Sequence, residues 1–168
     1  LVGSEMCIRD RPWEGYFHRD AVLFVIDAGM HMHEDVEHET AFIMALRAAL
    51  RFMHIKLVSS PKDYVGIMLW NTEASRMITP SKNPYYPHTI EYARLKQVDV
   101  PTTFELQQLL TAMQADPPAA RTRFPPASST MNVDHVLANA LHVITASVRA
   151  GTRRVFFLTN QDEPHAPP

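Results

Sequence analysis

The sequence predicts one α/β domain, Rossmann-like, with a mainly parallel sheet covered by helices on both faces. Short apolar runs rich in β-branched and aromatic residues alternate along the chain with longer amphipathic segments. The 168 residues are 46% hydrophobic, which suffices for one buried core. Strands that alternate with helices form parallel sheets, because each crossover helix packs back onto the sheet.

Three apolar runs bounded by charge are predicted to be buried strands, and a fourth run to be an edge strand. The three are HRDAVLFVID (18–27), KDYVGIMLW (62–70) and RRVFFLTN (153–160). The fourth, YARLKQVDV (92–100), alternates apolar and polar residues instead of running apolar, which favours a strand nearer the edge.

Three helices are predicted between the strands. The first, Ala41 to Val58, is apolar nearly all round and should be heavily buried, and the second is short. The third should end at Gly151 and turn Leu141 and Ile144 toward the sheet. The positions behind these predictions are the polar stripe of the first helix (Arg47, Arg51, His54), the apolar residues of the second (Leu106, Leu109, Leu110, Met113) and those of the third (Val133, Val136, Leu137, Ala140, Leu141, Ile144, Val148).

Proline clusters at 79–87 and 116–126 predict two loops, neither long enough to link domains. The opening LVGSEMCIRDRP, residues 1–12, resembles translated sequencing-adaptor read-through and is predicted to be a non-native leader. Residues 13–168 then form the domain. Because QDEPHAPP follows an apolar strand directly, we expect this domain to be truncated at its C-terminus.

Composition excludes several classes of protein. A single cysteine, Cys7, rules out an internal disulfide framework and a cysteine-based zinc site. No apolar run reaches the roughly 18 residues of a membrane span. The net charge is −2 with dispersed basic residues, so composition gives no electrostatic signature of nucleic-acid binding.

Asp27 ends the first predicted strand, where ligands of open α/β sheets bind. In the von Willebrand factor A-type fold, a hard cation is held there by an Asp-x-Ser-x-Ser turn, a later threonine and a later aspartate. Here Gly29 and His31 stand at the serine positions, Asn160 follows Thr159 where an aspartate is expected, and Thr130 is the candidate threonine. We therefore expect a degenerate site that holds no metal and no other cofactor.

Two other clusters are better explained by surface structure than by chemistry. His31, His33 and His38 lack the spacing of a helical zinc pair, so a solvated polar loop is expected. Asp162, Glu163 and His165 resemble a hydrolytic trio but lie in a predicted surface turn beside a proline. We expect no catalytic residues in this chain.

Several segments together resemble one family. HRDAVLFVIDAGMHM, IKLVSSPKDYVGIMLWNTE, YPHTIEYARLKQVDVP, NVDHVLANALHVI and RRVFFLTNQDEPH are similar, in this order, to the amino-terminal von Willebrand A-like domain of the seventy-kilodalton subunit of Ku, the DNA-end-binding heterodimer. The resemblance covers roughly residues 16 to 168. DAGMHM alone also fits the eighty-kilodalton subunit, whereas the later segments favour the seventy-kilodalton one.

The resemblance implies a protein-interaction domain in a nuclear protein of double-strand-break repair by non-homologous end joining and of telomere maintenance. Its implied partners are the eighty-kilodalton subunit, end-joining repair factors, and double-stranded DNA ends. The ends would be gripped without sequence specificity by a β-barrel ring that this chain lacks. No membrane is implied.

The resemblance implies little chemistry of its own. Some family members carry a Schiff-base lysine before the first strand, but PWEGYFHRD (12–20) contains none. The family is often labelled an ATP-dependent helicase, yet the five glycines are scattered singly and form no phosphate loop followed by lysine.

Two alternatives from other classes remain open. One is a stand-alone von Willebrand A-type adhesion or scaffold module with metal-dependent ligand binding. The other is an α/β hydrolase-like enzyme that uses Asp27, His31 or His165, against which stands the absence of a Gly-x-Ser-x-Gly elbow.

Overall fold

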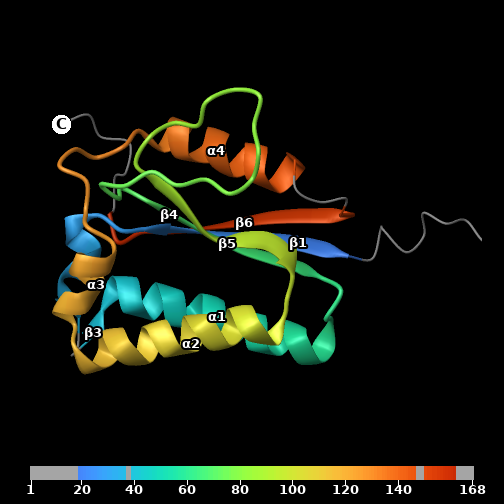
Figure 1. Ribbon diagram of the computed structural model, residues 1–168, viewed down its shortest axis with the longest axis horizontal. Helices are drawn as coiled ribbons and strands as arrows, with labels where there is room; N and C mark the ends of the chain where they lie inside the picture. Colours follow the sequence, from blue (N-terminus) through green and yellow to red (C-terminus); the bar gives the residue numbers. More distant parts are fainter. Residues whose placement is uncertain (1–18, 37–38, 147–149, 162–168) are drawn as a thin grey trace, which may run out of the picture.

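The computed structural model describes residues 19–36, 39–146 and 150–161, and shows a four-stranded sheet between two helical layers (Figure 1). The strand order is β5-β4-β1-β6, and all neighbours are parallel except β5, which runs antiparallel to β4. The strands are β1 (Asp20–Asp27), β4 (Tyr64–Trp70), β5 (Thr89–Gln97) and β6 (Thr152–Leu158). The predicted mainly parallel sheet is confirmed, and the antiparallel edge strand β5 makes it mixed.

Helices α1, α2 and α3 cover one face of the sheet and α4 covers the other (Figure 1). A single-turn 3-10 helix and a two-stranded hairpin join β1 to α1. The bounds are η1 (Met30–His33), β2 (Asp35–Val36), β3 (Glu39–Thr40), α1 (Ala41–Ser59), α2 (Val100–Ala115), α3 (Pro118–Arg123) and α4 (Val133–Ala146). Among the described residues, no helix is long and apolar enough to cross a membrane.

Strand β1 is the centre of the core because it is buried on both faces. Its alternate side chains belong to two separate hydrophobic clusters, one under α1 and α2 and one under α4. This is why its sequence runs apolar without alternation. The residues are Val22, Phe24 and Ile26 on the first side, and Ala21, Leu23 and Val25 on the second.

Polar side chains set where two of the helices begin. The Thr40 hydroxyl accepts from the Ile43 amide (3.3 Å) at the start of α1. The Asp99 carboxylate accepts from the Thr102 amide (2.8 Å) at the start of α2, with Pro101 in the first turn. These N-caps satisfy backbone donors that have no partner inside the helix.

The predicted phase of α4 is wrong at Leu141. This side chain is 63% exposed, whereas Val143 and Ile144 are buried against the sheet. The buried stripe includes Asn139, a polar residue that is 2% exposed because its amide bonds to the 79–88 segment. Leu137, also predicted in the stripe, is 43% exposed, so the two leucines place the predicted stripe too far around the helix.

Other boundaries also differ from prediction. The 116–126 segment is not wholly a loop, because α3 begins at Pro118, where proline is tolerated in a first helical turn. Gly151 is not a left-handed helix stop: no described glycine has a positive φ, and Gly151 directly precedes β6. The last predicted α4 contact, Val148, lies outside the described residues.

Burial is less complete than predicted in α1 and β6. Ile55 and Val58 of α1 are 62% and 89% exposed, on the side turned away from the sheet. Most of β6 is exposed as well, because β1 is its only strand partner among the described residues.

Candidate functional site

The candidate site lies where the carboxyl ends of β1, β4 and β6 meet at one edge of the sheet. Parallel strands bring their C-terminal ends to the same edge, and there the loops that follow them converge. Asp27 ends β1 with a fully buried side chain, Asn71 directly follows β4, and Thr159 directly follows β6. The Ala28 amide donates to the Trp70 carbonyl (2.8 Å) and fixes the β1 and β4 ends side by side.

Both oxygens of the Asp27 carboxylate accept hydrogen bonds from the chain itself. Oδ1 accepts from the Gly29 amide (2.8 Å) and from Nδ2 of Asn71 (2.9 Å). Oδ2 accepts from the Thr159 hydroxyl (2.9 Å) and lies 2.8 Å from Nε2 of His31. Because a carboxylate only accepts, Nε2 of His31 carries the proton in this contact. Four donor groups of the chain thus occupy the carboxylate oxygens of Asp27 that a cation would need as ligands.

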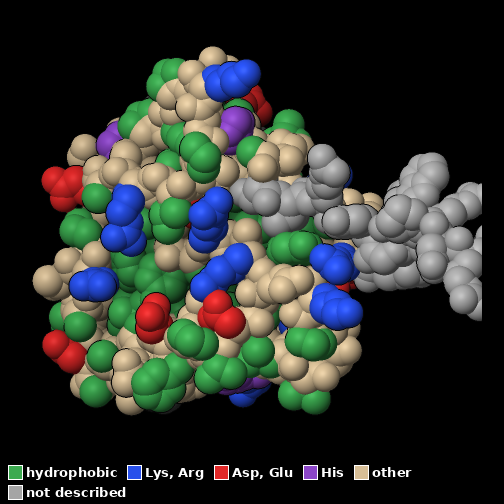
Figure 2. Space-filling view, turned by 45° about the vertical axis from the view of Figure 1, so that its right-hand side comes forward, with side chains coloured by type: hydrophobic (Ala, Val, Ile, Leu, Met, Phe, Trp, Pro, Cys, Tyr) green, Lys and Arg blue, Asp and Glu red, His purple; other side chains and the backbone are tan. Residues whose placement is uncertain are grey.

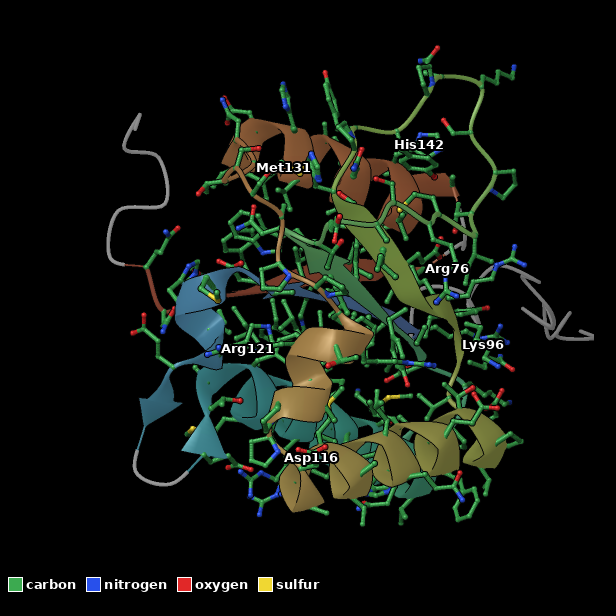
Figure 3. The ribbon with its side chains drawn as sticks, turned by 60° about the vertical axis from the view of Figure 1, so that its left-hand side comes forward. Arg76, Lys96, Asp116, Arg121, Met131 and His142 are labelled. Atoms are coloured by element: carbon green, nitrogen blue, oxygen red, sulfur yellow. The ribbon has the colours of Figure 1, made fainter. Side chains whose placement is uncertain are left out.

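Asn71 organises the site, although no motif in the sequence predicts a role for it. Its φ of 58° is in the left-handed region, which asparagine tolerates better than most residues. Its side-chain oxygen accepts from the Met131 amide (2.8 Å), and its carbonyl accepts from the Ala127 amide (2.8 Å). Asn71 therefore links Asp27 to the loop that leads into α4. Met131, which is labelled in Figure 3, lies in this loop. The signal in the sequence is an amide directly after a buried strand.

The glycine after Asp27 makes room for the His31 ring. A Cβ atom at Gly29 would lie 2.6 Å from Cε1 of His31 and 3.1 Å from Oδ1 of Asp27. A serine at this position would therefore collide with the imidazole. Gly29 and His31 act as a pair, in which the histidine fills the space left by the missing side chain.

The structure brings four of the five predicted positions together through hydrogen bonds, Asp27, Gly29, His31 and Asn160. Asp27, Gly29 and His31 are in contact. Asn160 donates from Nδ2 to the His31 carbonyl (2.9 Å), and its neighbour Thr159 reaches Asp27 instead. Thr130 is exposed and makes no hydrogen bond within the described residues.

A hard cation does not fit the donor set as it stands. Mg²⁺ and Ca²⁺ require several convergent oxygens. Among the described residues, Asp27 supplies the only carboxylate of this cluster, beside the imidazole of His31 and the side-chain amide of Asn71, which donates its N–H. Within residues 19–36, 39–146 and 150–161, no three His, Cys, Asp or Glu side chains are arranged to hold a metal ion.

His33 lies behind the site and differs in environment from His31. Its side chain is 4% exposed, and its ring is tilted against that of Phe42, with ring centroids 5.0 Å apart. Neither ring nitrogen has a hydrogen-bond partner among the described residues. Burial lowers the pKa of His33 below its ordinary 6.5, and the nearby Arg121 guanidinium lowers it further. Arg121, labelled in Figure 3, donates to the His33 carbonyl (3.1 Å). The neutral imidazole is thus part of the core.

The remaining candidates are only partly visible. His38 and the trio Asp162, Glu163 and His165 lie outside the described residues. Of the acidic residues between β1 and α1, Glu39 forms an ion pair with Arg47 and accepts from Gln114 (3.2 Å), which ties β3 to α1 and α2.

Comparison with known proteins gives one family. Residues 21–167 match the family described as the Ku70/Ku80 N-terminal alpha/beta domain. A protein of Rhipicephalus appendiculatus named "ATP-dependent DNA helicase 2 subunit 1" is 36% identical over 146 residues, which are 87% of this chain and 22% of that protein. Proteins named "ATP-dependent DNA helicase II subunit 1" from Chaetomium globosum and Schizosaccharomyces pombe are 31% and 25% identical over 88% and 86% of this chain. The chain spans about a quarter of the length of these curated relatives or slightly less.

Proposed function

Because the chain belongs to the Ku70/Ku80 N-terminal alpha/beta domain family, we propose that it is the protein-interaction domain of a Ku subunit that acts at DNA double-strand breaks. The hydrogen bonds around Asp27 are the observation that supports a protein-interaction role without a metal. A sheet edge whose acceptor atoms are occupied by the chain's own donors has no need of a cation, so partner binding should depend on surface shape and not on a metal.

The names of the relatives support assignment to the seventy-kilodalton subunit. Each relative named above is called subunit 1 of a DNA helicase. The partners we propose are the eighty-kilodalton subunit and end-joining repair factors, with action in the nucleus, in non-homologous end joining and in telomere maintenance.

This chain's own contribution to DNA binding should be small. The loop after Asp27 carries four carboxylates within six residues (Glu34, Asp35, Glu37, Glu39), and the net charge of the chain is −2. Like charges repel the phosphate backbone. End binding is therefore assigned to a β-barrel ring formed by both subunits, which a duplex can enter only at an end.

Mobility shifts of a blunt duplex at low salt test the proposal, with and without magnesium. The chain alone should bind more weakly than the roughly 10⁻⁴–10⁻⁶ M of ordinary non-specific binding. A longer version of the protein that includes the barrel region, co-expressed with the second subunit, should bind ends tightly and should retain the present domain in the complex. Tight end binding by the chain alone would contradict the assignment.

Capture of the second subunit, in magnesium and in EDTA, tests the alternative of a metal-dependent adhesion or scaffold module. Such a module would bind its partner only with magnesium, because the ion completes the binding surface. Capture of the second subunit that is equal in magnesium and in EDTA supports the Ku assignment, and capture that EDTA abolishes would favour the module.

A further inference from the structure

Edge strand β5 departs from regular pairing near the centre of its length. One step along β4, from Met68 to Ile67, corresponds to two steps along β5, from Glu91 to Ala93, so Tyr92 is an extra residue. A second register shift follows within two residues along β4. Bulges on an edge strand redirect side chains and discourage the addition of another strand. The side chains at this edge, more than its backbone, are thus available for recognition.

An open pocket of about 510 Å³ adjoins the first bulge. Three segments that are far apart in the sequence supply its main polar groups: Arg76 from the loop after β4, Tyr92 from the bulge, and Arg123 from the last residue of α3. Glu105 of α2 is the one acidic residue among the described residues that line the pocket. The positions of Arg76 and of Lys96 farther along β5 can be followed in Figure 3.

The pocket has an excess of hydrogen-bond donors. Arg76 and Arg123 are exposed, and neither forms an ion pair within the described part of the chain. The Tyr92 hydroxyl makes no hydrogen bond there either. Burial and Glu105 raise the pKa of Tyr92, against the opposing effect of the two guanidinium groups, so the hydroxyl remains a donor at neutral pH. Figure 2 shows Lys and Arg side chains gathered across the middle of one face of the molecule.

We propose that the pocket formed by Arg76, Tyr92 and Arg123 binds a phosphate monoester, carried on a phosphorylated side chain of a partner peptide. Guanidinium groups form paired hydrogen bonds to phosphate oxygens, and a phosphate monoester offers three acceptor oxygens and up to two negative charges. Donors from three segments suit three oxygens better than the two coplanar oxygens of a carboxylate. Arg clusters are a recurrent means of recognising phosphorylated peptides.

The arrangement of charge favours a peptide over a nucleic-acid strand. A strand of nucleic acid requires a continuous series of cations along its backbone. Here Glu105 lies in the pocket, and Lys96 farther along β5 is paired with Asp99 (2.6 Å). A single phosphoryl group can avoid these carboxylates, whereas a polyphosphate backbone would pass close to them.

The test is fluorescence anisotropy of the 168-residue chain with a labelled phosphoserine peptide and its unphosphorylated twin. The phosphorylated peptide should bind, and Arg76→Gln and Arg123→Gln should each weaken binding about tenfold, because each removes a charge-assisted hydrogen bond. Tyr92→Phe should weaken it about threefold, since it removes a neutral donor. Arg51→Gln is the matched control: Arg51 is exposed on α1, outside the pocket, and forms no ion pair among the described residues. Circular dichroism verifies that each variant is folded.

Competition by free O-phosphoserine separates the two sources of the phosphoryl group. Competition as strong as that of the peptide assigns the pocket to small phosphate monoesters, and much weaker competition assigns it to phosphopeptides. Equal binding of both peptides, or an equal loss in Arg51→Gln, would overturn the proposal. It would also be overturned if a short single-stranded oligonucleotide bound more tightly and depended on the same two arginines. None of these outcomes depends on the chain being part of Ku.

Discussion

Replacement of Asp27 tests whether the carboxylate is retained for hydrogen bonding. In Asp27→Ala, the Gly29 amide and the Asn71 side-chain amide lose their acceptor in a buried site. Each buried donor left without a partner costs about 1–3 kcal/mol. His31 and Thr159 are part-exposed and can turn to water, so they add little. We expect Asp27→Ala to lower the free energy of unfolding by about 3–5 kcal/mol.

Asp27→Asn is the matched variant, because it keeps the shape and one oxygen. That oxygen can still accept from Gly29 and Asn71, while the new NH₂ group faces Thr159 and His31, both of which can act as acceptors. The remaining loss is that of charge assistance, which we expect to cost about 1–2 kcal/mol. Urea unfolding followed by far-UV circular dichroism measures both variants, with the slope m verifying that the unfolding transition is unchanged.

Two results would refute this reasoning. The first is an Asp27→Asn variant as unstable as Asp27→Ala, since hydrogen-bond loss could not then explain the difference between the side chains. The second is a higher melting temperature of the unmodified chain in magnesium that disappears in Asp27→Asn, because a ligand that binds only the folded state stabilises it.

Three further changes test other parts of the structure. Ile144→Ala should cost about 2–5 kcal/mol and Leu141→Ala less than about 0.5 kcal/mol; similar melting temperatures would contradict the observed phase of α4. Because His33 is buried and its folded pKa lies below the unfolded 6.5, its neutral form stabilises the fold above pH 6.5. This contribution to the free energy of unfolding should be lost as pH falls toward the folded pKa, by up to about 1.4 kcal/mol per pH unit. In His33→Phe, the free energy of unfolding should depend less on pH below pH 6.5, and an unchanged dependence would show that His33 is not its cause. The buried Glu91 carboxylate accepts from the Ile78 and Thr79 amides (2.8 and 2.6 Å) and from the Thr79 hydroxyl (2.7 Å). Glu91→Ala should therefore destabilise the chain by about 3 kcal/mol and speed proteolysis near Thr79. Equal cleavage of the variant and the unmodified chain would contradict this prediction.

The sequence by itself determined the elements of the core and the position of the site. The apolar run that ends at Asp27 can be buried only as a central strand, because alternate side chains must enter two cores. From that strand follows the place of Asp27 at the carboxyl edge. Gly29 and His31, in place of oxygen-bearing residues, are also the reason to expect no cation there, and that expectation needs only residue types.

Only the tertiary structure decided which partners replace the missing oxygens. Asn71 is 44 residues from Asp27 in the sequence, and Thr159 is 132 residues away, so no local pattern could pair them. The phase of α4 depended in the same way on Asn139, whose amide holds the backbone at Tyr86, 53 residues distant. A polar residue is buried when its hydrogen-bonding groups find partners, and those partners are brought near only when the chain folds. Local periodicity therefore located the helix and the inward position of Ile144, but it could not show that Leu137 and Leu141 face solvent.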